Sequence, residues 1–190
     1  MCAPNFLQSG AMNVLVISCS LNPGSNSHAL AREAAAALQA SGVGAALVDL
    51  REHEMPLCDG ETCTNRSVAD LTEAVRAADA ILLAVPVYNF DANAAAKNLV
   101  EHTGSAWEKK IVGFLAAAGG HSSYMSIMSL ANSLMLDFHC LIVPRFVYAV
   151  GQDFTGGSVS NPKVAARLTQ LLAETIRITG ALAATAPTPR

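Results

Sequence analysis

The sequence predicts a doubly wound α/β fold, in which a parallel five-stranded sheet carries helices on both faces. Short apolar or β-branched runs alternate five times with helical patterns along the 190 residues, which is typical of βαβ units. The central run, residues 80–85, is continuously apolar, as in a strand that is covered on both sides. Apolar residues make up 52% of the chain and charged residues 14%, which is enough for one buried core.

The first half of the chain contains two strands and two helices. Residues 13–19 are β-branched and apolar, so they predict a strand. Residues 25–40 predict a helix, with Ser or Asn at its start, an alanine-rich body and a glycine after its end. Residues 45–50 predict the second strand, and residues 67–78 the second helix.

The second half repeats this alternation after the central strand. Residues 92–102 predict a helix and residues 110–116 a strand. Residues 124–136 predict the fourth helix, and residues 140–150 the fifth strand, with a proline near its middle. An Asn-Pro pair then caps the last helix, residues 161–179.

Right-handed crossovers leave few arrangements for these units. The flavodoxin-like strand order 2-1-3-4-5 suits a chain of this length, and it places a ligand beyond the carboxyl ends of strands one, three and four. The loops after Cys19, Val85 and Ala116 should therefore share one site. We expect a single domain over residues 13–182, with residues 1–12 and 183–190 as flexible termini, and Met12 as an alternative start.

Composition excludes several classes of partner. The net charge is -3, with only 12 Lys and Arg residues, and no basic cluster is present to bind nucleic acid. The charge-poor stretch 111–136 is interrupted by Gly119-Gly-His-Ser-Ser123, so it is too short to cross a membrane. The first residues show neither a basic segment nor a long apolar one, so we expect no signal peptide and a cytoplasmic location.

The five cysteines are expected to be reduced thiols in the cytoplasm. Cys19 and Cys140 have no neighbouring cysteine and lie in predicted strands, so we interpret them as small buried apolar side chains. Cys58 and Cys63 lie four residues apart in a loop, where redox or metal use remains an alternative. No two matched pairs of Cys or His have zinc spacing, so no metal site is predicted.

The first of the three loops joins a strand directly to a helix. Unpaired N–H groups and a positive dipole at a helix start bind phosphate without Lys or Arg, and an ordinary helix cap is the alternative interpretation. Neither a Walker loop nor a G-x-G-x-x-G fingerprint is present. The candidate phosphate ligands are Ser20, Asn22, Ser25, Asn26 and Ser27.

The second and third loops have the residues expected around a planar heteroaromatic ring. Pro86 is expected to end its strand and turn the chain out of the sheet. Paired glycines let the backbone approach a ligand edge. The alternative interpretation of both loops is a plain turn. His121 could donate a hydrogen bond to the ring, and the alternative is that it is an ordinary surface histidine. The candidates are Pro86, Val87, Tyr88, Asn89 and Phe90, then Ala118, Gly119, Gly120 and His121.

Over residues 13–150 the chain resembles the NADPH-dependent FMN reductase family of flavodoxin-like proteins. The resemblance is carried by Ser20-Leu-Asn-Pro-Gly-Ser-Asn-Ser-His-Ala-Leu30, by Pro86-Val-Tyr-Asn89 with Lys97-Asn98, and by Gly119-Gly120. It implies that FMN is held at its phosphate and ribityl end by the first loop. The second loop would then flank the isoalloxazine, and the two glycines its pyrimidine edge.

Three positions depart from the family pattern. Cys19 stands where Gly is usual, and Asn22 stands where Arg is frequent, which removes a charge-assisted phosphate contact worth about 1–3 kcal/mol. Phe90 stands where Gly is common, and the resemblance implies that it would narrow the mouth above the flavin. Two cysteines are too few for the iron–sulfur cluster of some related flavoproteins.

The resemblance implies hydride transfer from NADPH or NADH to flavin N5 and then reduction of a second acceptor. That acceptor is a free flavin, a quinone, a nitro or azo compound, or a metal oxyanion, and no catalytic side chain is assigned. The alternatives are a non-enzymatic FMN electron carrier, which is usually more acidic, and a relative that has lost flavin. Cys-x5-Arg and G-x-S-x-G are absent, which excludes a tyrosine phosphatase and an α/β-hydrolase.

The family resemblance also implies a homodimer or a dimer of dimers, with the helices after the Tyr-Asn loop packed across subunits. A small-residue segment, Ala92, Ala94, Ala95 and Ala96, would permit such close approach. Alanine is also a common helix former, which is the alternative explanation for this segment.

Overall fold

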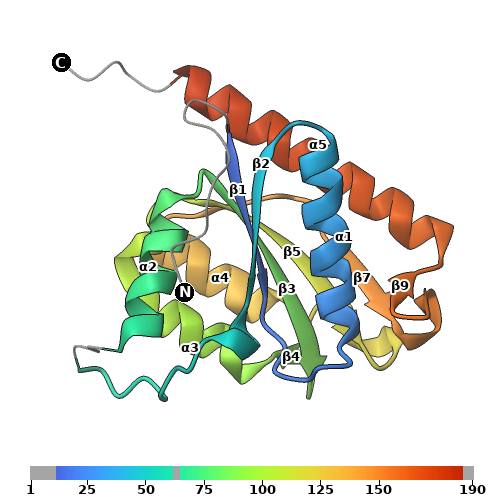
Figure 1. Cartoon of the computed structure of the whole chain (residues 1–190), viewed down its shortest axis with the longest axis horizontal. Coiled ribbons are helices and arrows are strands. Elements are labelled where there is room, and N and C mark those ends of the chain that lie inside the picture. The colour runs from blue at the N-terminus through green and yellow to red at the C-terminus, as the bar shows by residue number, and fades with distance from the viewer. Residues whose placement is uncertain (1–11, 62–64, 186–190) are drawn as a thin grey trace.

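The computed structural model describes residues 12–61 and 65–185. It contains a mostly parallel sheet between two layers of helices (Figure 1). The strands of the sheet are β1 (Asn13–Ser18), β2 (Gly44–Asp49), β3 (Ala80–Tyr88), β4 (Asp91–Ala92), β5 (Ile111–Ala118), β6 (Leu141–Ile142) and β7 (Val147–Val150). The helices are α1 (Asn26–Ala40), α2 (Arg66–Ala77), α3 (Ala94–Thr103), α4 (Met128–Phe138) and α5 (Pro162–Thr185).

The strand order is β2-β1-β3-β5-β6, and β7 also pairs with β5. It agrees with the predicted order 2-1-3-4-5, because β6 and β7 are two parts of the predicted fifth strand. Both parts run parallel to β5, and residues 143–146 separate them. Two further features were absent from the prediction: β4, which is antiparallel to β3, and a two-stranded hairpin of β8 (Phe154–Thr155) and β9 (Ser158–Val159).

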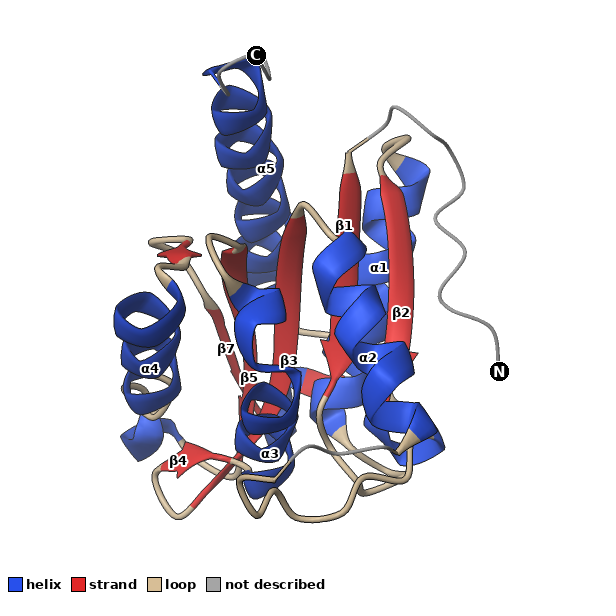
Figure 2. Cartoon of the chain, turned by 90° about the vertical axis from the view of Figure 1, so that its left-hand side faces the viewer, coloured by secondary structure: helices blue, strands red, loops and turns tan. Residues whose placement is uncertain are grey.

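Alternating side chains of the strands feed two apolar clusters, one on each face of the sheet. In β1, Leu15 and Ile17 belong to the cluster covered by α2, α3 and α4, whereas Val14 and Val16 belong to the cluster covered by α1 and α5. Figure 2 shows α2, α3 and α4 together on one side of the sheet. Both faces of the central strands are therefore buried, as their continuous apolar runs predicted.

Pro86 does not end the third strand, contrary to the prediction. β3 continues to Tyr88, and Pro86 pairs with Ala117 of β5. The carbonyl of Ala84 faces β1, where it accepts the N–H of Cys19, so the position of Pro86, two residues on, also faces that side. Proline has no N–H for the next ladder bond, to the carbonyl of Cys19. Nδ2 of Asn93 donates to that carbonyl instead, so proline is tolerated where β1 ends.

Two helix starts and one helix end also differ from the predictions. α3 begins at Ala94 because Ala92 pairs with Val87 in the β3–β4 hairpin. α4 begins at Met128. Tight turns occupy the preceding segment, and in one of them the N–H of Ser126 donates to the carbonyl of Ser123 at 3.0 Å. α5 continues to Thr185.

The expectation of flexible termini concerns mainly residues outside the described part of the chain. Within that part, residues 183–185 are the last residues of α5. The carbonyl of Met12 accepts the N–H of Gly44 at 3.1 Å. The side chain of Met12 packs against the α1–α5 cluster.

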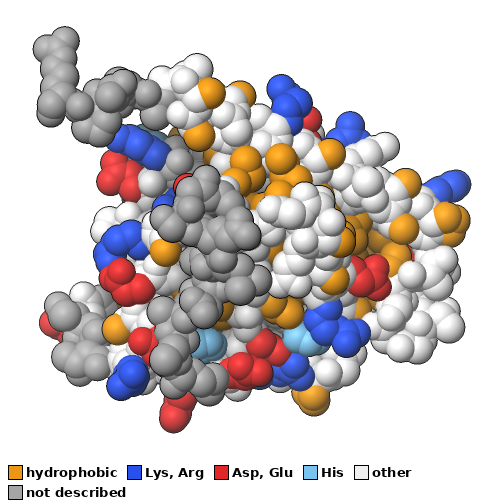
Figure 3. All heavy atoms as spheres, turned by 45° about the horizontal axis from the view of Figure 1, so that its top comes forward, with side chains coloured by type: hydrophobic (Ala, Val, Ile, Leu, Met, Phe, Trp, Pro, Cys, Tyr) orange, Lys and Arg blue, Asp and Glu red, His pale blue; other side chains and the backbone are white. Residues whose placement is uncertain are grey.

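Charges on the surface are mixed. On the face drawn in Figure 3, acidic and basic side chains lie among one another rather than in separate patches. No helix among the described residues has both the length and the apolar character needed to cross a bilayer. Nor does this part of the chain bring together three or more His, Cys, Asp or Glu side chains that could hold a metal ion.

Candidate functional site

The three loops singled out in the sequence line one groove at the carboxyl edge of the sheet. The groove has a volume of about 260 Å³, and parallel strands place their following loops at this edge. Its lining comprises Asn22, Gly24, Ser25 and Asn26 from the first loop, Pro86, Val87 and Tyr88 from β3, Ala117, Ala118 and Gly119 from β5 and its loop, and Gly151 after β7. Ser25, Tyr88 and the glycine loop thus face a common space.

The first loop presents the start of α1 to this groove. Ser25 is the N-cap, and its Oγ accepts the N–H of Ser27 at 3.2 Å. The side chain of Asn22 accepts the N–H of Gly24 at 2.9 Å, which braces the turn. The N–H of Asn26 has no hydrogen-bond partner among the described residues. An anionic group in the groove would meet this donor and the positive end of α1, so the loop fits a phosphate.

Two predicted phosphate ligands lie behind the groove rather than in it. Ser20 and Ser27 are fully buried. The Oγ of Ser20 accepts the N–H of Asn22 at 3.2 Å, and the Oγ of Ser27 lies 2.7 Å from that of Ser25. These hydroxyls therefore hold the loop in shape.

The second loop is the tip of the β3–β4 hairpin. Tyr88 pairs with Asp91, so Asn89 and Phe90 form a two-residue turn, with φ of 50° and 65°. Tyr88 lines the groove and is still 53% exposed, so much of its side chain is available to a ligand. Asn89 and Phe90 are exposed at the rim and do not line the groove.

The third loop offers bare backbone to the groove. A Cβ added to Gly119 or Gly120 would meet no atom within 4 Å, so the space beside both residues is open. Of this pair, Gly119 lines the groove. A planar ring can approach such backbone closely and use its N–H groups. The loop therefore fits the edge of a flavin.

Residues that the sequence analysis missed hold this third loop in place. The hydroxyl of Tyr148 donates to the carbonyl of Gly120. The side chain of Gln152 lies 3.3 Å from Nε2 of His121. Both residues reach this loop because the carboxyl end of β7 lies beside that of β5. The predicted extension of the fifth strand to residue 150 was the sequence feature that could have indicated them.

Asn93 is a second residue that was missed, and it connects the first two loops. It occupies the N-cap position of α3 without capping that helix. Its Nδ2 instead donates to the carbonyl of Cys19 at 2.7 Å, and its Oδ1 is buried with no hydrogen-bond partner. This side chain therefore ties the start of the first loop to the base of the β3–β4 hairpin.

The Lys97-Asn98 motif lies in α3, away from the groove lining. Asn98 accepts the N–H of Cys58 and donates to the carbonyl of Pro56, both at 2.9 Å. His102, one turn further on, contacts the same carbonyl at 2.8 Å. The asparagine of this motif therefore fastens the loop after β2 to α3.

A polar cluster lies behind the first loop, at the ends of β1 and β2. Nδ1 of His28 lies 3.1 Å from Oγ of Ser18 and 3.3 Å from a carboxylate oxygen of Asp49. Burial lowers the pKa of His28, although Asp49 opposes this effect. Burial also acts to raise the pKa of Asp49, but hydrogen bonds from Arg51 outweigh it, and the net pKa is lowered. At neutral pH we therefore expect a neutral imidazole beside a carboxylate.

We expect this cluster to make the protein less stable in mild acid. The pKa of His28 is about 6.5 in the unfolded chain and lower in the folded protein, so the unfolded state binds more protons as pH falls through 6.5. The contribution is present above that pH and is lost below it. Melting temperatures of wild type and His28→Gln at pH 7.5 and 5.5 test this. The variant should lose less stability on acidification, and an equal loss would contradict the assignment.

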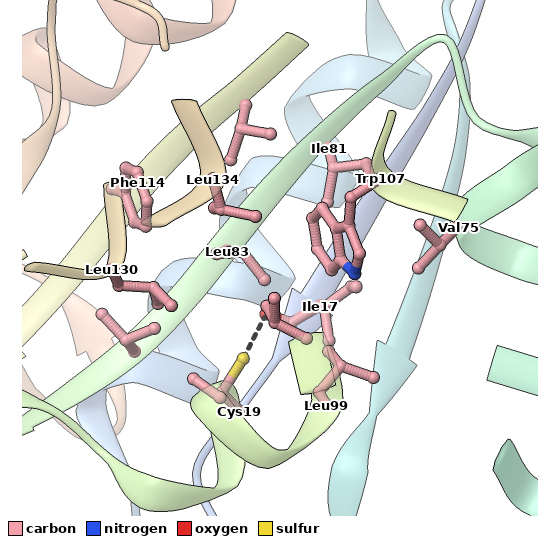
Figure 4. Packing of buried hydrophobic residues seen from close by; sticks show 14 of the residues in the cluster. Ile17, Cys19, Val75, Ile81, Leu83, Leu99, Trp107, Phe114, Leu130 and Leu134 are labelled. Atoms are coloured by element: carbon pink, nitrogen blue, oxygen red, sulfur yellow. Dashed lines mark hydrogen bonds between the residues drawn. The ribbon is translucent and has the colours of Figure 1, made fainter. Parts of the chain in front are cut away.

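Cys19 and Cys140 are buried, as predicted. Cys19 lies in the core beside Ile17 and Leu99 (Figure 4), and its Sγ donates to the carbonyl of Ile17 at 3.8 Å. Burial raises the pKa of both thiols, that of Cys140 to about 11. Cys58 is free and partly exposed. Cys63, the other cysteine of the same predicted loop, lies outside the described residues.

Thiol labelling should distinguish these positions. In a variant with Cys2→Ser and Cys63→Ser, one thiol per chain, that of Cys58, should react rapidly with a disulfide reagent at pH 7.5, because thiolates are the reactive species. Denaturation should expose Cys19 and Cys140 as well. The further change Cys58→Ser should abolish the fast phase, and a fast phase that survives it would refute the prediction.

A doubly wound parallel sheet with this strand order and a ligand groove at its carboxyl edge places the chain in the class of flavodoxin-like proteins. The sequence profile of the NADPH-dependent FMN reductase family matches residues 12–155, and the chain belongs to this family. It is an NAD(P)H-dependent flavin oxidoreductase whose cofactors are FMN and NAD(P)H. The resemblance of residues 13–150 is thereby confirmed.

Individual relatives agree with this assignment. The chain is 26% identical over 136 residues to an NAD(P)H-dependent FAD/FMN reductase of Geobacillus thermodenitrificans, covering 70% of this chain and 74% of the relative. It is 28% identical over 116 residues to an NADPH azoreductase of Bacillus sp., covering 60% and 65%. The solved structure of FerB, a flavoenzyme NAD(P)H:(acceptor) oxidoreductase from Paracoccus denitrificans, superposes with a TM-score of 0.74 at 18% identity, covering 90% and 98% of the two chains.

Proposed function

We propose that the groove binds FMN with its phosphate at the start of α1 and its ring between Tyr88 and the Gly119–Gly120 backbone. The observation that carries this proposal is the convergence of the three loops on one groove. Asn22, Ser25 and Asn26 would serve the phosphate and ribityl end, and Pro86 and Val87 would support the ring. Ser20 and Ser27 would act from behind, by shaping the loop.

The reaction is the transfer of two electrons from a nicotinamide to a small organic acceptor. Bound FMN would supply the redox chemistry, as an acceptor of hydride from a nicotinamide and a donor of two electrons. In the balanced reaction with a quinone, NAD(P)H gives up a hydride and the solvent a proton. The products are NAD(P)⁺ and the hydroquinone. The chain binds and orients both partners, and the exposed side of Tyr88 leaves access for the second substrate.

Anaerobic spectroscopy tests the proposal. The purified protein, loaded with FMN, should show flavin absorbance that bleaches when NADPH or NADH is added and returns when a quinone follows. A protein that keeps its yellow colour with both nicotinamides would be an electron carrier, which would overturn the proposal. A protein that does not bind FMN at all would overturn it equally.

We also propose that the protein is a homodimer in the cytoplasm. Met128, Met135 and Leu136 leave an apolar surface on α4 exposed, which supports contact with a second copy. The predicted small-residue segment contributes less, because Ala96 is fully buried in its own chain. Free thiols at Cys19, Cys58 and Cys140 support a reducing compartment. Sedimentation that shows only a 20-kDa-sized species would overturn the dimer.

A further inference from the structure

Phe90 occupies an unfavourable backbone conformation at the rim of the groove. The two-residue turn of the β3–β4 hairpin has positive φ at both residues, 50° at Asn89 and 65° at Phe90. Such turns favour Asn followed by Gly, and a positive φ at a bulky residue is an outlier. The chain therefore tolerates strain at this position.

Neither apolar cluster of the described residues offsets that strain. Phe90 is 66% exposed and belongs to neither apolar cluster. The close aromatic pairs among the described residues join Tyr124 to Phe146 and to Tyr148, and they do not include Phe90. Strain kept without internal compensation is characteristic of functional positions, so a contact outside the chain is the expected benefit.

Hydrogen bonds fasten the base of the hairpin that carries Phe90. At its base, Oδ1 of Asp91 accepts the N–H of Ala92 at 2.7 Å and the hydroxyl of Ser129 in α4 at 2.6 Å. Figure 2 shows β4 folded back beside the end of β3. Tyr88 lines the groove two residues before Phe90, so the turn that carries Phe90 lies beside the groove into which a second substrate must come.

We propose that Phe90 is a specificity-determining residue that stacks on planar aromatic electron acceptors, of the quinone and azo class. This inference rests on the proposed function and narrows its acceptor. Offset or edge-to-face packing on an aromatic ring favours flat aromatic molecules over small inorganic ones. The gain in binding such acceptors would outweigh the backbone strain of Phe at a position where Gly would be unstrained.

Two substitutions separate strain from stacking. Phe90→Gly removes both, whereas Phe90→Leu keeps a side chain in the strained turn but removes the aromatic face. We expect Phe90→Gly to raise the melting temperature of the protein without FMN by about 2–4 °C, and Phe90→Leu to leave it near that of wild type. Both variants should bind FMN as tightly as wild type, because Phe90 does not line the groove.

The acceptor measurements use 2-methyl-1,4-naphthoquinone and ferricyanide. Both variants should show a KM for the naphthoquinone about 5- to 10-fold above wild type, which is the range expected of a lost aromatic contact. The KM for ferricyanide should stay unchanged. In calorimetry with the FMN-loaded protein, the redox-inert 2-naphthamide should bind both variants more weakly, while cyclohexanecarboxamide should not distinguish them from wild type.

Three outcomes would overturn the inference. If both variants keep the KM for the naphthoquinone and the affinity for 2-naphthamide, Phe90 does not contact the acceptor. If Phe90→Gly instead changes the sedimenting species with these constants unchanged, the ring contacts a second copy of the chain. If wild type fails to bind FMN, the proposed function fails, and this inference fails with it.

Discussion

Ser25→Asp should weaken FMN binding by at least about 100-fold. Two unit charges about 4 Å apart interact by about 4 kcal/mol at the effective dielectric constant of a protein surface, and each 1.4 kcal/mol is about tenfold in affinity. The substitution places a carboxylate at the N-cap of α1, beside the position proposed for a doubly charged phosphate. Asp is itself a good N-cap, so the helix should stay folded. Titration of FMN followed by fluorescence measures the effect.

Riboflavin is the matched control for this prediction, because it lacks the phosphate. Ser25→Asp should bind riboflavin about as well as wild type does, so the preference for FMN should disappear. Ser25→Asn adds a neutral N-cap of similar size and should keep most of that preference. Equal weakening of FMN and riboflavin in the Asp variant would mean that the phosphate lies elsewhere.

The meeting of the three loops could be predicted because it depends on local sequence and one rule of topology. Apolar runs located the strands, and the right-handed crossover placed the ends of β1, β3 and β5 at one edge. The groove lined by Ser25, Tyr88 and Gly119 follows from these two facts. The resemblance of the motifs then indicated what the groove binds.

Other features depended on the length of neighbouring strands, which no local pattern specifies. Pro86 was predicted to end its strand, but only the pairing with β1 stops before it, at Ser18 and Ala84, while the pairing with β5 includes it. Ser20 and Ser27 have the residue type of phosphate ligands, and only the folded loop shows that they point inward. Residue type predicted the chemistry of the loop but not the direction of each side chain.

Contacts between distant segments were out of reach of the sequence analysis. Asn93 and Cys19 are 74 positions apart, and Tyr148 and Gly120 are 28 apart. An Asn before an alanine-rich helix normally predicts a cap, and that expectation hides its use as a bridge. Such a departure from a local rule is most frequent at functional sites.

Asn93→Ala should both destabilise the protein and make the first loop less ordered. The substitution removes the donor to the carbonyl of Cys19, and a buried carbonyl without a partner costs about 1–3 kcal/mol. We expect the melting temperature to fall by about 5 °C. We also expect an FMN dissociation constant about tenfold higher, because the first loop must then be ordered by the ligand. Hydrogen exchange over residues 20–25 should become faster without FMN.

Asn93→Ser separates this bridge from the stability of α3. Serine at the N-cap can accept an N–H of the helix, which is worth about 1 kcal/mol, but its side chain is too short to replace the bond to Cys19. This variant should recover part of the melting temperature while its FMN affinity and loop exchange stay like those of Asn93→Ala. Recovery of FMN affinity in step with melting temperature would show that Asn93 acts through α3. Asn93 would then be an ordinary helix-start residue rather than the tie between the two loops that form the groove.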